Sequence, residues 1–313
     1  MKILSAFFSG AALALAATSG AWAAQPLLTP AELNALHQQP SVRVIDIRPA
    51  DVYAAGHIPG AVSAPYAQWR GPANNPGQVP PVDRLEQQVR ALGVDRNVHA
   101  VVVSSGADGT DFGASARVYW TLKYLGLKEL SILNGGEKAW AAAGLPQDKA
   151  APAVKASAFQ AHPDDSILAT TDQVAAQVGN PRTKLVDARP LDFYLGKVKA
   201  PTAQVPGTIQ GAVNVENSRW FQPGTSIFVS PDQARKIAAE LLPGEQAAET
   251  ISFCNTGHWA ATDWFALSEI VGVKNVRLYP ESMAEWSQDA SRPMDNVPGR
   301  GSQILNKVKG LFG

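Results

Sequence analysis

Hydrophobic and polar positions follow two kinds of pattern along this chain. Short β-branched and apolar runs that end in polar residues predict buried strands at 42–48, 99–105, 130–133, 183–189, 249–254 and 276–279. Between them, apolar residues three and four apart predict helices at 115–126 and 261–272, and each helix ends at a glycine of the C-cap type. Strands that alternate with helices predict an α/β fold with a mostly parallel sheet and helices on both of its faces.

The two halves of the chain share the same landmarks in the same order. "VIDIRP" at 44–49 returns as "LVDARP" at 185–190, and "YLGLKELSIL" at 124–133 returns as "IVGVKNVRLY" at 270–279. A tryptophan follows each copy of the second landmark at the same distance. The repeating unit is far longer than the roughly 20 to 50 residues of a solenoid repeat. The chain therefore contains two copies of one whole domain.

The first 23 residues have the pattern of a secretory signal peptide. Lys2 opens a short charged region, "ILSAFFSGAALALAA" is an apolar core, and Ala21-Trp22-Ala23 is a small-x-small cleavage site. A retained membrane helix is the alternative, but the apolar run is shorter than the about 20 residues that a span needs. We therefore expect cleavage after Ala23 and a periplasmic or secreted protein with no membrane segment.

These patterns divide the chain into five parts. We expect a signal peptide at 1–23, a first domain at 24–150, a linker at 151–165, a second domain at 166–300 and a tail at 301–313. The linker lies in an Ala/Pro-rich stretch that has neither helical nor strand periodicity. The tail is either a short amphipathic helix docked on the body or a frayed end.

Charge and cysteine content narrow the chemistry. The 27 Lys and Arg residues balance 27 Asp and Glu residues, which gives no indication of a nucleic-acid partner. The chain has a single cysteine, Cys254, so an internal disulfide is impossible. In an exported protein this thiol is either a buried bystander or a working group.

The surroundings of Cys254 favour a working group. The residue ends a predicted strand, and a predicted helix begins about six residues later, which is where ligands bind in open α/β sheets. Gly257 can adopt a positive φ angle and let successive backbone N–H groups point at the sulfur. These N–H groups and the helix N-terminus favour negative charge, so they favour the reactive thiolate.

A thiolate in such a loop could attack an electrophilic sulfur, a phosphorus or a carbonyl carbon. Phosphate chemistry would require an arginine to grip the phosphate oxygens, and "CNTGHWA" at 254–260 contains none. A cysteine protease would require a histidine base with an orienting partner, and nothing in the sequence marks a partner for His258. Attack on sulfur is therefore the favoured chemistry.

Several motifs together resemble the tandem-domain rhodaneses, the sulfurtransferases that include thiosulfate and 3-mercaptopyruvate sulfurtransferases. "YAAGHIPGA" at 53–61 and the segment 117–146 are similar to the non-catalytic domain of that family. "LVDARPLDFYLG" at 185–196 and "CNTGHWA" are similar to its catalytic domain. "YPESMAEW" at 279–286 is a degraded form of the C-terminal family motif "YDGSWxEW". The resemblance covers nearly the whole mature chain and implies two rhodanese-like domains.

The resemblance implies a role for the cysteine and its loop. Cys254 matches the residue that carries a sulfane sulfur as a persulfide. The N–H groups of the six-residue loop would hold that sulfur, and they belong to Asn255, Thr256, Gly257, His258, Trp259 and Ala260. Counting back from the "LG" landmarks places Asp108 opposite Cys254 in the first domain. That domain has no thiol there and is expected to be catalytically silent.

Two further residues match family positions, each with an alternative. Arg189 matches an arginine that helps to bind the anionic donor, and the alternative is a structural ion pair with Asp187. His57 matches a position that in part of the family faces the active site across the domain interface. Its alternative is a structural histidine that is hydrogen-bonded within its own domain.

The loop departs from both known subtypes. Thiosulfate-type loops resemble Cys-Arg-Lys-Gly-Val-Thr and carry cations, whereas mercaptopyruvate-type loops resemble Cys-Gly-Ser-Gly-Val-Thr. Here Asn255 and Thr256 are neutral, and Thr256 could donate a hydrogen bond to the substrate. His258, if protonated, could replace some of the missing positive charge. Trp259 is either packed at the start of the helix or forms a wall of the pocket.

We therefore predict a sulfurtransferase that works through a Cys254 persulfide, with no cofactor and no metal. Thiosulfate is favoured over 3-mercaptopyruvate as donor because the chain is expected outside the cytoplasm, and a thiol or cyanide is the expected acceptor. A persulfide carrier or binding module without turnover, docked to an exported redox partner protein, is the alternative. A redox sensor is a third reading, because an exposed thiolate is prone to oxidation.

Overall fold

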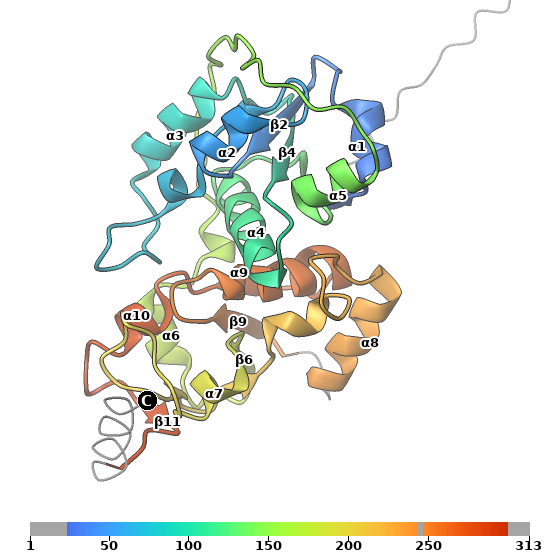
Figure 1. The fold of residues 1–313 in the computed structure, drawn as a ribbon. Helices are drawn as coiled ribbons and strands as arrows, with labels where there is room; N and C mark the ends of the chain where they lie inside the picture. Colours follow the sequence, from blue (N-terminus) through green and yellow to red (C-terminus); the bar gives the residue numbers. More distant parts are fainter. Residues whose placement is uncertain (1–23, 243–246, 300–313) are drawn as a thin grey trace, which may run out of the picture.

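The computed structural model describes residues 24–242 and 247–299, which form two domains stacked one on the other (Figure 1). The predicted signal peptide at 1–23 and the tail at 301–313 lie outside these residues. Among the described helices, none is long and apolar enough to cross a membrane.

The first domain is built on a five-stranded sheet in which every neighbouring pair of strands is parallel, in the order β1-β5-β4-β2-β3. Its strands are β1 (Leu27–Leu28), β2 (Val42–Asp46), β3 (Val62–Ser63), β4 (His99–Val103) and β5 (Leu130–Leu133). Its helices are α1 (Pro30–Leu36), α2 (Ala50–Ala55), α3 (Val82–Ala91), α4 (Gly109–Tyr124) and α5 (Gly136–Ala142), with a 3₁₀ turn at Tyr66–Trp69.

The second domain repeats this plan with a four-stranded parallel sheet in the order β10-β9-β6-β8. Its strands are β6 (Thr183–Asp187), β8 (Val213–Asn214), β9 (Glu249–Phe253) and β10 (Val276–Leu278), beside an antiparallel pair of β7 (Thr208–Ile209) and β11 (Met294–Asp295). Its helices are α6 (Thr171–Gln177), α7 (Leu191–Tyr194), α8 (Pro231–Leu241), α9 (Trp259–Phe265) and α10 (Ser282–Trp286). Shorter turns lie at Asp165–Ile167 and Asn217–Trp220.

Side-chain alternation along the central strands explains why helices cover both faces of each sheet. Successive residues of a strand point to opposite faces. In β4, Val101 and Val103 pack with α1, α2 and α5, whereas Ala100 and Val102 pack with α3 and α4. A strand that is apolar on both faces must be covered twice, which confirms the predicted fold class.

The six predicted strands and the two predicted helices are present, and each helix ends at a glycine in the left-handed region, with φ of 95° at Gly126 and 84° at Gly272. The helix that follows Cys254 differs from the prediction in one respect. After Phe265 it continues as a π-helix over Ala266–Val271. Its second half is therefore wound more widely than an α-helix.

The residue opposite Cys254 is Ser104, not Asp108. Strand pairing matches Val103 with Asp46 in the first domain and Phe253 with the equivalent Asp187 in the second, so the next residues, Ser104 and Cys254, are equivalent. Counting back from the "LG" landmarks fails because the first domain has four more residues between this point and its glycine, about one helical turn. There is still no thiol at this position.

The two domains share one hydrophobic core. Helices α4 and α9 pack against each other at the centre of the molecule (Figure 1). The rings of Phe112 and Tyr119 from α4 lie 5.7 Å and 5.1 Å from the ring of Phe265 on α9. Next to them, the Glu269 carboxylate accepts hydrogen bonds from the Tyr119 hydroxyl at 2.8 Å and from the Lys123 ammonium at 2.7 Å. The relative position of the domains is therefore fixed by side-chain packing.

We predict that Phe265→Ala weakens both domains together. Phe265 is fully buried among aromatic rings from both domains, so its truncation leaves a cavity that costs about 3–5 kcal/mol of unfolding free energy. Urea titration followed by fluorescence measures this loss. Val52→Ala, at a position 41% exposed on α2, is the control and should change the unfolding free energy by less than about 1 kcal/mol. Equal losses for the two variants would contradict a shared core.

Candidate active site

Cys254 lies at the carboxyl end of β9, where the chain turns through a short loop into α9. The residue is 1% exposed and belongs to the shared hydrophobic core. Gly257 is the turning point, with φ of 65°. A Cβ atom at this position would lie 2.4 Å from the Pro280 carbonyl oxygen, so both the backbone angle and the available space require glycine.

Ser282 anchors this loop from the start of α10. Its Oγ accepts hydrogen bonds from the N–H groups of Cys254 at 2.9 Å and Gly257 at 3.2 Å, and it donates one to the Tyr279 carbonyl at 2.8 Å. Ser282 is fully buried and holds a φ of 53°, which is uncommon outside glycine. The three hydrogen bonds offset that strain. Ser282 belongs to "YPESMAEW", so the family motif contained the signal for this residue although its role was not predicted.

Helix α10 also fixes the direction of two loop peptides. The N–H of Met283 donates to the Cys254 carbonyl at 3.1 Å, and the N–H of Ala284 donates to the Asn255 carbonyl at 2.9 Å. In a trans peptide the C=O and the following N–H point in opposite directions. The N–H groups of Asn255 and Thr256 therefore point away from α10, and within the described residues neither donates to another protein atom.

Two arginines of the first domain hold the next two peptides. Arg117 Nη1 donates to the Gly257 carbonyl at 3.2 Å, and Arg70 Nη2 donates to the Thr256 carbonyl at 2.8 Å. By the same geometry the N–H of His258 points away from Arg117, and it too donates to no other atom of the described structure. The loop thus presents three unused N–H groups.

The last two predicted loop residues, Trp259 and Ala260, are the first residues of α9. Their N–H groups belong to the first turn, which has no acceptors within the helix. The Trp259 side chain is half-buried, and its ring lies 6.0 Å from that of Phe193 on α7. Its indole N–H donates to the Thr110 hydroxyl at 3.2 Å, so this tryptophan also joins the two domains.

The surroundings of His258 favour its neutral form, in which the ring does not supply the positive charge that the loop lacks. Its Nε2 lies 2.6 Å from the Thr110 carbonyl, which can only accept, so Nε2 carries the proton and Nδ1 accepts from the Tyr66 hydroxyl at 2.9 Å. Burial, followed by the positive charge of Arg70, lowers the pKa of His258 to about 4. The ring fits tightly because a Cβ atom at Gly113 would lie 2.9 Å from it.

Arg189 forms the structural ion pair with Asp187. Its Nη2 lies 2.6 Å from the Asp187 carboxylate, and both side chains are buried, as are those of the equivalent pair Arg48 and Asp46 in the first domain. Arg189 reaches the loop only through Nη1, which donates to the Asn255 side-chain oxygen at 3.3 Å. A direct role in donor binding stays a prediction.

His57 does not face Cys254. It is fully buried, its Nδ1 lies 2.9 Å from the Tyr53 carbonyl and its Nε2 lies 3.4 Å from the Ala150 carbonyl. Its ring stacks on that of Tyr53 at 3.8 Å. Since every partner belongs to the first domain, the structural alternative for His57 is the correct one. The cross-domain contacts are made by Tyr66, Arg70, Thr110 and Arg117 instead, for which the sequence offered no signal beyond the family motif "RVYW".

The equivalent loop of the first domain is closed by one of its own side chains. The Asp111 carboxylate accepts hydrogen bonds from the N–H groups of Gly106 at 2.5 Å and Ser105 at 3.3 Å. Amides that in the second domain remain unused are therefore bound here to an internal anion. With Ser104 in place of the cysteine, this loop has no thiol, and its N–H groups at Ser105 and Gly106 are already bound.

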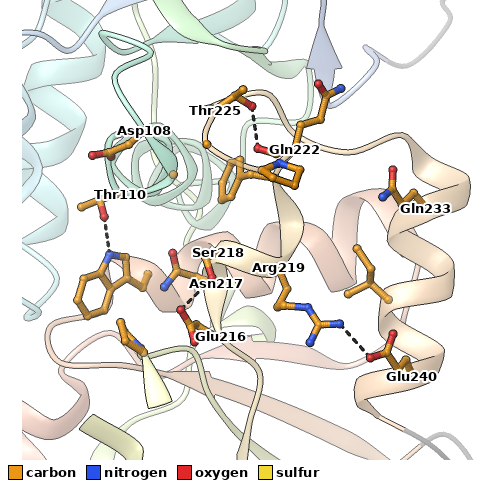
Figure 2. A pocket seen from close by; sticks show the side chains of 17 residues that line it. Asp108, Thr110, Glu216, Asn217, Ser218, Arg219, Gln222, Thr225, Gln233 and Glu240 are labelled. Carbon is orange, nitrogen blue, oxygen red and sulfur yellow. Dashed lines mark hydrogen bonds and ion pairs between the residues drawn. The ribbon is translucent and has the colours of Figure 1, made fainter. Parts of the chain in front are cut away.

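A groove of 840 Å³ runs beside the catalytic loop between the two domains (Figure 2). Asp108 and Thr110 line it from the first domain, and Glu216, Asn217 and Trp259 line it from the second. Cys254 is not among its lining residues. In the described part of the chain, His, Cys, Asp and Glu side chains form no cluster that could hold a metal ion.

Comparison with known proteins agrees with this geometry. A model of the rhodanese-like domain matches residues 29–143 and again residues 170–289. The chain belongs to the rhodanese family. This rhodanese is 31% identical over 294 residues to a probable 3-mercaptopyruvate sulfurtransferase of Pseudomonas aeruginosa, covering 86% of this chain and 97% of that protein. It is 30% identical to a thiosulfate sulfurtransferase of Azotobacter vinelandii, covering 88% and 98%.

Solved structures show the same fold. The rhodanese superimposes on SseA from Escherichia coli, described as a 3-mercaptopyruvate sulfotransferase, with a TM-score of 0.72, 23% sequence identity and coverage of 82% of this chain and 98% of that one. The predicted family, the tandem domains and the assignment to the sulfurtransferase enzymes are confirmed.

We predict that Ser282→Ala disrupts the loop of this rhodanese. Removing Oγ leaves the buried N–H groups of Cys254 and Gly257 without an acceptor, which costs about 1–3 kcal/mol of unfolding free energy and releases the loop. Urea unfolding measures the first effect, and the rate at which iodoacetamide alkylates Cys254 measures the second. Ser287→Ala is the matched control, since Ser287 is the buried serine that follows α10, and its Oγ bonds to the Met283 carbonyl and the Gln204 N–H and not to the loop. It should lower stability without changing the alkylation rate, and equal rates in both variants would contradict the anchoring role.

The low pKa of His258 predicts a pH dependence of stability. Its pKa is lower in the folded protein than in the unfolded chain, so the unfolded chain binds more protons between about pH 4 and pH 6.5. Stability contributed by this ring is complete above that window and is lost as the pH falls through it, by about 1–3 kcal/mol. In His258→Gln the unfolding free energy should fall less steeply between pH 6.5 and pH 4. Parallel curves for the two proteins would show that the ring does not titrate in this way.

Proposed function

We propose that this rhodanese transfers a sulfane sulfur through a persulfide on Cys254. The observation that carries the proposal is the set of three N–H groups, on Asn255, Thr256 and His258, that have no acceptor in the described structure. In each case the carbonyl oxygen of the same peptide group accepts a hydrogen bond from outside the loop, which fixes the direction of the N–H. An outer persulfide sulfur carries negative charge, and unused N–H groups stabilise such a charge without having to reorganise.

The proposed reaction has two displacement steps. In the first, the Cys254 thiolate attacks the outer sulfur of thiosulfate, the S–S bond of the donor breaks, and sulfite leaves with the electron pair. In the second, cyanide or a thiolate attacks the outer sulfur of the persulfide. Thiocyanate or a new persulfide then leaves, and the Cys254 thiolate is regenerated. No net electron transfer to another group is required.

Thiosulfate is the donor that we favour over 3-mercaptopyruvate. The relatives include proteins named for each of the two donors, so their names do not decide between them. The preference rests on export through the signal peptide that we propose at 1–23, because an inorganic sulfur anion is a plausible substrate outside the cytoplasm. Arg189, which reaches Asn255, is proposed to help bind the donor.

A persulfide carrier is the second candidate, because Cys254 is 1% exposed and lies outside the neighbouring groove. Such a protein would pass its sulfur to an exported redox partner instead of a small acceptor. Two of the reasons for this alternative are weakened by the fold. The degraded motif "YPESMAEW" keeps the serine that anchors the loop, and arginines of the first domain lie against a loop that has no cation of its own.

Mass spectrometry and steady-state kinetics test the proposal. After incubation with thiosulfate, the intact protein should gain one sulfur atom, and Cys254→Ala should gain none. With cyanide as acceptor, an enzyme forms thiocyanate continuously, whereas a carrier forms about one equivalent and stops. Running thiosulfate and 3-mercaptopyruvate side by side determines the donor. No gain of sulfur from either donor or from polysulfide would refute sulfur transfer, and faster reaction with peroxide would favour a redox sensor.

A further inference from the structure

The catalytic loop contains no cationic side chain, yet two arginines from the other domain donate hydrogen bonds to its backbone carbonyls. Arg117 lies on α4 and donates from two different nitrogens, to the Gly257 carbonyl at 3.2 Å and to the Gly77 carbonyl at 2.8 Å. Arg70 follows the 3₁₀ turn at Tyr66–Trp69 and donates to the Thr256 carbonyl. Neither arginine forms an ion pair with a carboxylate in the described structure.

Both guanidinium groups place positive charge against the backbone of the loop, and the carboxylate that acts on Arg117, that of Glu281, forms no ion pair with it in the described structure. Arg117 is fully buried, and burial together with the charge of Arg70 lowers its pKa to about 9, so it remains protonated at neutral pH. A negative charge on Cys254 raises the pKa of Arg117, so the guanidinium and an anion at the sulfur attract each other. Arg70 Nη1 is buried and has no hydrogen-bond partner within the described residues.

We propose that Arg70 and Arg117 of the silent first domain are positioning residues for the catalytic loop, and that they supply the positive charge that selects an anionic donor. This proposal rests on the proposed function. It gives the first domain a role in the reaction, because the fixed direction of the His258 N–H depends on the bond between Arg117 and Gly257. It also explains how a loop without cations can accept a doubly charged anion.

Both effects follow from elementary physics. An unpaired carbonyl can rotate, and with it the N–H on the other end of the same peptide, so losing Arg117 releases the His258 N–H. Losing Arg70 leaves the Thr256 carbonyl unpaired, and that peptide is then held only by the bond from the Gly257 N–H to Ser282. A buried cation whose neighbours are carbonyl oxygens is not neutralised by them. Its field therefore extends to the site and is stronger there than it would be in water.

Pairs of variants and pairs of reagents distinguish the effect of the arginine charge from the effect of loop positioning. Arg70→Met and Arg117→Met remove the charge, whereas Arg70→Lys keeps it. Arg90→Met is the matched control, because Arg90 also lies in the first domain and donates to a backbone carbonyl, that of Phe159 at 2.6 Å, away from the loop. Melting temperatures of all four variants establish that they are folded. If Arg117→Met does not fold, the half-buried Arg70 carries the test alone.

Sulfur loading is measured with thiosulfate, a dianion, and with methanethiosulfonate, which carries the same sulfane sulfur and a single charge. Each Met variant should slow loading from thiosulfate about 10- to 100-fold. The fold-decrease in loading from methanethiosulfonate should be about five times smaller, because this donor carries a single charge. Arg70→Lys should keep the wild-type ratio between the two donors, as should Arg90→Met. Unchanged rates, or equal losses for the two donors, would overturn the proposal.

A second measurement does not depend on sulfur transfer. Because Cys254 is the only cysteine, the ratio of its alkylation rates with anionic iodoacetate and neutral iodoacetamide reports the electrostatic potential at the sulfur. The ratio should exceed that of free cysteine in the wild type and fall several-fold in both Met variants. A wild-type ratio at or below that of free cysteine, or a chain that reacts with neither reagent, would refute the claim that the arginines create a positive potential at the sulfur. A protein that passes this test but never loads sulfur would instead refute the proposed function.

Discussion

The active site of this rhodanese depends on the fixed orientation of the peptide groups that follow Cys254. Every peptide unit from Cys254 to His258 is held on one side by a hydrogen bond from outside the loop. The donors and acceptors are Ser282, the first N–H groups of α10 and two arginines. Because the peptide group is rigid and planar, these bonds leave the N–H groups of Asn255, Thr256 and His258 unpaired on the opposite side, whereas the Gly257 N–H donates to Ser282. The loop is therefore preorganised for an anion.

The first domain contributes to this arrangement through its contacts with the loop. Its own loop is closed by Asp111 and has no thiol, so it offers no chemistry of its own. Its helix α4, however, packs on α9 through a continuous aromatic core and carries Arg117 to the catalytic loop. The duplicated domain thus contributes a rigid surface in place of a second site. The Tyr66 hydroxyl and the Thr110 carbonyl on the same surface hold His258 in its neutral form.

Local patterns of hydrophobic residues and glycines predicted much of the fold, and the predictions that were wrong have specific physical causes. Strand periodicity and C-cap glycines located β4, β6, β9, α4 and α9 because such patterns are set by near neighbours in the chain. Counting from the glycine misplaced the residue opposite Cys254, since a helix can be lengthened by a turn without any change in the strand that precedes it. His258 was assigned a possible charge because its contacts with residues of the other domain could not be foreseen.

The sequence by itself determined the duplication, the α/β architecture, the family and the position of Cys254 at the end of a strand. Tertiary structure alone decided which side chains surround that cysteine. Arg117 and Gly257 are 140 residues apart, and Arg70 and Thr256 are 186 apart. Contacts at such separations leave no periodicity in the chain, because they arise only when two completed domains pack against each other. The charge on His258 follows from the same packing, since burial and a neighbouring arginine set its pKa.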